Sequence, residues 1–258
     1  MNVYLQARAP AVLEEVQAVY ADVLSRLYQA FFRAYVAGLG RLERPAPSRH
    51  DLLGTEPERQ KSWTDRFATA AAGSGNPFAL GDRAALIVHN DADLIVPHEA
   101  AEQKARFSFD ALFRSLNRYL LDSVTSEWLF CIEWFGPNDL FARVFAAPLQ
   151  QCLQSVAASV RSSYDCLGLL IMLRLTALNK LTMVRRGIPA LVPYFQKLDA
   201  LLLPRLLEVL QLHAASVAAF QVLFSFFFLL WFSRGRGRRL PGAWSCGRTL
   251  SCGGTRSC

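Results

Sequence analysis

The sequence predicts an all-α fold, an antiparallel bundle or rod of about five helices. Apolar residues recur at spacings of three and four over most of the chain, which is the period of a helix. Beyond residue 106 the links between these patterns are mostly short, which favours antiparallel neighbours. Of the 258 residues, 52% are hydrophobic and 12% aromatic, so the chain can bury a sizeable core.

The N-terminal segment, residues 1–42, contains the first predicted helix, at residues 12–42. Pro10 is compatible with a helix start, and Gly38, Gly40 and Pro45 end the pattern. Its apolar residues trace one stripe: Val12, Val16, Val19, Val23, Leu27, Phe31, Tyr35, Leu39 and Leu42. This pattern predicts an amphipathic helix.

A long connection follows at residues 43–106, punctuated by proline and glycine. Connections of this length are uncommon in compact domains and are usually functional or disordered. Residues 86–88 and 94–96 are short β-like runs, which could pair briefly or lie extended on the helices. We therefore expect an irregular linker with short extended segments.

The segment 107–135 carries the strongest helix signal. Its apolar residues recur at three and four, and Gly136 with Pro137 stops the helix. The residues expected to be buried are Leu112, Leu116, Leu120, Trp128 and Ile132. The aromatic side chains on this helix are predicted to lie in the bundle core, with docking of a partner helix as the alternative.

Three more helices are predicted within a helical core at residues 107–220. Asn138 is expected to cap the first, which ends near Ser162 and Ser163. The second covers about residues 164–184, and the third runs from about Pro189 to about Phe220.

Charge and residue chemistry argue against several classes of function. Residues 1–208 carry 22 basic and 21 acidic side chains, which leaves no excess for a nucleic-acid-binding face. We expect no catalytic, cofactor-binding or metal site, because no nucleophile, base and orienting group occur together. Side chains weighed for such chemistry are His50, His89, Asp91, Asp93, His98, Ser115, Asp122, Ser123, Glu127, Glu133 and His213. Glu127 and Glu133 are expected to be solvated or ion-paired, and Arg185 and Arg186 to complement the dipole of their helix.

The cysteines are expected to be structural or unpaired. Cys131, Cys152 and Cys166 lie within apolar helical patterns, where cysteine acts as a small hydrophobe. The three C-terminal cysteines have no nearby histidine and match no zinc spacing: Cys246, Cys252 and Cys258.

Several short motifs resemble a known family. They include Phe-Asp-Ala-Leu-Phe-Arg-Ser at 109–115, Leu-Leu-Asp at 120–122 and Glu-Trp-Leu-Phe-Cys-Ile-Glu at 127–133. Others occur in the same order at 51–56, 78–83, 94–98, 139–141, 164–165, 173–174 and 188–191. Over about residues 12–219 the chain resembles the middle region of the vacuolar protein sorting-associated protein 52 family, a subunit of the Golgi-associated retrograde protein (GARP) tethering complex.

The resemblance implies a non-enzymatic vesicle tether acting in endosome-to-Golgi retrograde transport. It implies contacts with other subunits of the GARP and EARP tethers, with SNARE proteins and with Rab-type small GTPases. It also implies peripheral attachment to trans-Golgi network and endosome membranes, besides a cytosolic pool. Residues 12–42 would then be the end of the coiled-coil region through which the family assembles.

The sequence changes character after residue 220. Residues 221–232 are nearly all Phe and Leu, and an Arg/Gly run and a Gly/Cys/Ser/Arg tail follow to residue 258. We favour a translated intron over two alternatives, a tail anchor and a buried apolar extension. The tail-anchor alternative uses residues 214–232, nineteen positions without a charge, and would make the chain a membrane protein with a cytosolic helical domain.

Overall fold

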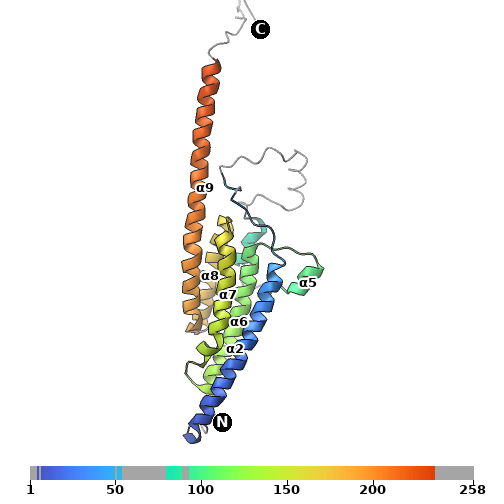
Figure 1. Ribbon diagram of the computed structural model, residues 1–258, viewed down its shortest axis with the longest axis vertical. Helices are drawn as coiled ribbons and strands as arrows, with labels where there is room; N and C mark the ends of the chain where they lie inside the picture. The colour runs from blue at the N-terminus through green and yellow to red at the C-terminus, as the bar shows by residue number, and fades with distance from the viewer. Residues whose placement is uncertain (1–4, 6, 50, 54–79, 89–92, 236–258) are drawn as a thin grey trace, which may run out of the picture.

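Long helices lie side by side in an elongated bundle in the computed structural model of the chain (Figure 1). The structure describes residues 5, 7–49, 51–53, 80–88 and 93–235. The α-helices are α2 (Pro10–Gly40), α4 (Ala84–Val88), α5 (Pro97–Glu102), α6 (Phe109–Phe135), α7 (Leu140–Ser162), α8 (Cys166–Arg185) and α9 (Val192–Gly235). Two single-turn 3₁₀ helices are η1 (Gly81–Arg83) and η2 (Pro189–Leu191). The predicted all-α fold is confirmed, and no strand occurs within the described ranges.

Five long helices form the bundle. α2 packs mainly against α7, and α8 packs against both α9 and α6. In Figure 1, α2 lies along one edge of the bundle and α9 along the opposite edge, where it extends well beyond the other helices. The largest fully buried side chains come from all five helices and include Phe32, Phe113, Phe145, Leu169 and Phe195. One core therefore joins the bundle from α2 to α9.

The turns between the helices follow from local sequence. α6 ends where Gly136 adopts a φ of +77°, and its amide donates to the carbonyl of Ile132. Asn138 then takes the expected capping role, because its Oδ1 accepts the amide of Leu140 at 3.0 Å. Gly187, with a φ of +69°, turns the chain after α8. The first turn sets α6 against α7, and the second sets α8 against α9.

The buried face of α6 differs in part from the prediction. Leu112, Leu116 and Leu120 are buried as expected, and Trp128 is half-buried. Ile132 was expected to be buried, and this prediction is wrong, because its side chain is 38% exposed. A helix turns about 100° per residue, so repeated steps of four rotate the stripe by roughly 200° between Leu112 and Ile132. Cys131 occupies the core position instead.

The linker contains more helix than predicted. Residues 86–88 were expected to be extended, but they form part of α4. Short apolar runs do not distinguish a strand from a buried helical turn, which explains this error. The second run lies extended, with Val96 at φ −90° and ψ 108°. There the amide of Ile95 donates to Ser115 of α6, and its carbonyl accepts the hydroxyl of Tyr35 from α2.

The last helix is longer than the sequence pattern indicated. α9 was expected to end near Phe220, but it continues to Gly235. Residues 221–234 contain neither proline nor glycine, so nothing in the sequence stops the helix before that point.

Candidate functional site

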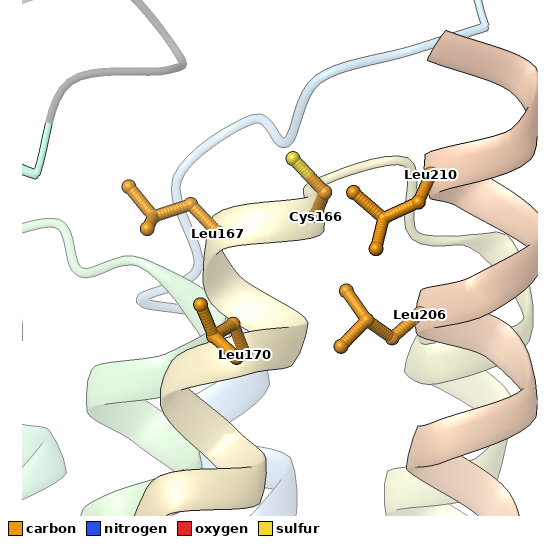
Figure 2. A pocket seen from close by; sticks show the side chains of 5 residues that line it. All are labelled: Cys166, Leu167, Leu170, Leu206 and Leu210. Carbon is orange, nitrogen blue, oxygen red and sulfur yellow. The ribbon is translucent and has the colours of Figure 1, made fainter. Parts of the chain in front are cut away.

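An apolar groove lies between α8 and α9. Cys166, Leu167 and Leu170 of α8 face Leu206 and Leu210 of α9 across it (Figure 2). The groove encloses about 190 Å³. Leu170 and Leu210 remain 54% and 45% exposed, so the groove opens to the surface. Because all of its lining side chains are apolar or a thiol, the groove suits an apolar side chain better than a charged ligand.

Other exposed apolar side chains lie on the same two helices. On α9 they are Leu203, Leu207 and Val217, and on α8 they are Leu181 and Val184. Large exposed apolar surfaces mark sites of contact with proteins or membranes. The groove was not predicted from the sequence. The signal was present as a second leucine stripe on α9, one position out of register with the buried one.

Arg205 orders one end of the groove. Its Nε and Nη2 atoms donate to the carbonyl of Ser163, at 3.1 and 2.9 Å. The guanidinium also lies over the ring of Tyr164, 4.9 Å from the centroid, and pairs with Glu208. These contacts fasten the turn between α7 and α8 to α9, so the groove walls are held at a fixed spacing.

A buried ion cluster joins three parts of the chain. Arg83 Nε lies 3.0 Å from Asp110 Oδ2 of α6, and Arg83 Nη2 lies 2.7 Å from Asp165 Oδ2. Asp165 also caps α8, because its Oδ1 accepts the amide of Gly168 at 2.8 Å. The Arg83 guanidinium donates to both carboxylates, so the cluster fixes the linker to α6 and to the start of α8.

Glu127 was expected to be solvated or ion-paired, and this prediction is wrong. Its side chain is buried between α6 and α2, where it accepts the hydroxyl of Tyr20 at 2.6 Å and that of Tyr28 at 2.9 Å. The Cys131 thiol lies 3.5 Å from the same carboxylate. Because both tyrosines belong to α2, this polar cluster fixes the register of α2 on the bundle.

Alkaline pH is expected to destabilise the protein through this cluster. Burial and the neighbouring Glu127 raise the pKa of the Tyr20 and Tyr28 hydroxyls above the ordinary value of 10.0. A raised folded-state pKa means that the stabilisation is complete below the unfolded pKa and is lost as pH rises above it. The urea midpoint should therefore fall from about pH 9 to about pH 11. The double variant Tyr20→Phe, Tyr28→Phe should show a smaller fall, and an equal fall in both proteins would contradict the prediction.

The other candidate residues do not come together. His50, His89 and Asp91 lie outside the described residues. His98 is exposed beside Glu99, whereas His213 is buried far along the chain, with Nδ1 accepting the amide of Leu53. Among the residues that the structure describes, no group of three or more His, Cys, Asp or Glu side chains could hold a metal ion.

Other polar candidates serve packing between helices. The Ser115 hydroxyl lies 2.7 Å from that of Tyr35 and accepts the amide of Ile95. Arg186 follows α8 and reaches across to α6, where it donates to Thr125 and pairs with Asp122. Neither arrangement places a base beside a nucleophile.

The cysteines of the bundle match the expected structural role. Cys131 and Cys152 are buried and unpaired, and Cys166 is partly exposed at the groove. Burial raises the pKa of the Cys152 thiol to about 12, so this thiol stays protonated at neutral pH. The three C-terminal cysteines lie outside the described residues.

Among the residues that the structure describes, two helical segments are long and apolar enough to cross a membrane by length and composition. The first, Cys166–Arg185, is α8, with 44% of its most apolar window buried in the bundle. The second is Pro189–Ala219, with 22% buried. The core helices of soluble proteins pass the same test, so these segments alone do not define a membrane protein.

Comparisons with known proteins point to one family. A family model described as "Vps52, C-terminal" matches residues 22–223. The chain is 32% identical over 214 residues to vacuolar protein sorting-associated protein 52 A of Arabidopsis thaliana. It is 31% and 30% identical over 223 residues to the homologues of Rattus norvegicus and Homo sapiens. Each alignment covers 83% of this chain and 30% of the relative. No solved structure matches the chain.

The fold and these matches together define the class: an all-helical protein similar to vacuolar protein sorting-associated proteins. The chain belongs to the Vps52 C-terminal family. The resemblance in the sequence motifs is thereby confirmed. The chain spans about 30% of the length of these relatives.

Proposed function

We propose that the chain is a non-enzymatic component of a vesicle-tethering complex in endosome-to-Golgi retrograde transport. In this proposal it binds other subunits of the GARP or EARP tethers through helical surfaces. SNARE proteins and Rab-type small GTPases are further proposed partners. The proposed location is the cytosolic surface of trans-Golgi network and endosome membranes, with a cytosolic pool.

The groove between α8 and α9 is the observation that carries this proposal. Its five lining side chains are apolar or a thiol, and the exposed leucines beside it extend the contact area. A helix of a partner subunit could place apolar side chains at three- and four-residue spacing into such a groove. Membership of the Vps52 family makes a subunit of the same tether the preferred partner.

Charged substitutions in the groove test this role. Leu170→Asp with Leu210→Asp should lower the recovery of sibling tether subunits by about tenfold or more, because it places charges in an apolar interface. Val88→Asp is the matched control, since Val88 is also exposed but belongs to α4. Unchanged recovery with the groove variant, at unchanged helical content by circular dichroism, would overturn the proposal.

A tail-anchored membrane protein is the second candidate function. The continuity of α9 supports it, because residues 214–232 are helical throughout, as a spanning segment must be. In that case the full chain should resist carbonate extraction from membranes. Complete release by carbonate would exclude this candidate while leaving the tether proposal intact.

A further inference from the structure

One face of α2 is apolar and exposed. Val12, Val16, Val19, Val23 and Leu27 have exposed fractions between 43% and 58%. Three alanines continue the same face and are also exposed: Ala30, Ala34 and Ala37. We call these eight residues the α2 seam. The side of α2 that packs on the bundle is a different one, formed by residues that include Leu13, Tyr20, Leu24, Tyr28 and Phe32.

The seam has the spacing of a coiled coil. From Val12 to Val23 its members are separated by four, three and four residues. From Leu27 to Ala37 they are separated by three, four and three. One additional step of four, between Val23 and Leu27, joins the two halves. The spacing of the seam is therefore the same in both directions from Val23, with a heptad pattern on each side.

Four charged residues border the seam on one flank. Each stands immediately before a seam residue: Glu15 before Val16, Asp22 before Val23, Arg26 before Leu27 and Arg33 before Ala34. All four are exposed. In a coiled coil these are the positions that select a partner helix through charge. The two acidic residues lie in the first half of the seam and the two basic residues in the second.

We propose that the seam binds the same seam of a second copy of this chain, antiparallel, with the two-fold axis at Val23. This alignment places Val23 against Val23 and Val19 against Leu27. It also places Val16 against Ala30 and Val12 against Ala34, so a larger side chain meets a smaller one in the outer layers. The proposal is independent of the groove between α8 and α9.

The charges satisfy the same alignment. Glu15 lies opposite Arg33 of the second copy, and Asp22 lies opposite Arg26 of the second copy, so the two-fold axis generates four ion pairs. Positions on this flank pair with each other only in antiparallel coiled coils. A parallel pair would need the other flank, where Tyr20 is already bonded to Glu127. Charge complementarity thus favours the seam of a second copy as the partner, and it favours the antiparallel orientation.

The bundle leaves room for this contact. α2 forms an edge of the bundle in Figure 1. Within one chain Asp22 pairs with Arg26, but these side chains are 60% and 71% exposed. An ion pair this exposed contributes little, so its exchange for pairs with the second copy costs little.

Charge reversal tests the proposal with the full chain in sedimentation experiments. The variant Glu15→Arg, Asp22→Arg has only basic residues on the flank, and Arg26→Glu, Arg33→Glu has only acidic ones. Each variant alone should self-associate at least about tenfold more weakly than the parent chain. Added salt should weaken the self-association of the parent chain. An equimolar mixture of the two variants should form the dimer again. The single variants Glu14→Arg and Glu15→Arg form a matched pair. Glu14 is exposed on the opposite side of α2, so only Glu15→Arg should weaken self-association.

The outcomes separate this dimer from other associations. Weakening by each reversal and recovery in the mixture would support it. A parent chain that stays monomeric would overturn the proposed dimer. Coverage of the α2 seam only by a helix of another protein would also overturn it. Self-association that persists unchanged in both reversed variants would also overturn it, because the contact would then lie elsewhere in the chain.

Discussion

Arg83→Met is expected to lower the free energy of unfolding by about 3–5 kcal/mol. The substitution keeps much of the side-chain volume but removes the cation between Asp110 and Asp165. The side chain of Asp110 is fully buried, and that of Asp165 is 16% exposed. Two carboxylates would therefore remain close together without a counter-ion. Urea unfolding monitored by circular dichroism measures the loss.

Lys180→Met serves as the control for this prediction. Lys180 also pairs with an aspartate, Asp199, but the two side chains are 37% and 41% exposed. An exposed pair of this type contributes about 0–1 kcal/mol. Equal losses for the two variants would show that the buried cluster has no special role in the fold.

Phe145→Ala should also cost about 3–5 kcal/mol. The side chain is fully buried between α7 and α2, with ring centroids 4.6 Å from Tyr28 and 5.0 Å from Phe141. Truncation removes these contacts and leaves a cavity where α2 meets the bundle. Thermal or urea unfolding of the variant provides the measurement.

Two variants on α6 calibrate this result. Leu129→Ala should have little effect, because that side chain is 55% exposed. Trp128→Ala should fall between the two, since Trp128 is only half-buried and contacts Phe141 edge-on at 5.2 Å. A loss for Leu129→Ala as large as that for Phe145→Ala would contradict the assigned packing.

The helices could be predicted because their apolar period is long and regular. α6 and α7 begin and end close to the expected residues, with Gly136 and Asn138 in their expected roles. The buried side was harder to predict, as Ile132 and Glu127 show. Which side of a helix is covered depends on neighbours far away in the sequence. Glu127 is buried only because Tyr20 and Tyr28, about a hundred positions earlier, supply its hydrogen bonds.

The groove could not be predicted for a related reason. Its two walls come from different helices, and their spacing depends on the contacts of Arg205 with the preceding turn. A sequence shows that leucines recur on α9, but it does not show which of them face α8. Likewise, the apolar stripe of α2 was visible in the sequence, but which of its members are exposed depends on the side that packs on α7. Its first part is exposed, whereas Leu39 and Leu42 are buried.

The length of α9 makes it a mechanical lever. Its 44 residues span about 66 Å as one helix, and it lies against α8 only along its first part. Pro204 lacks the amide that would bond to the carbonyl of residue 200, so the helix has one backbone hydrogen bond fewer just before Leu206 and Leu210. Arg205 and the buried Val209 and His213 hold this part of α9 on the bundle. A load applied near Gly235 would therefore be borne by the same helical turns that line the groove.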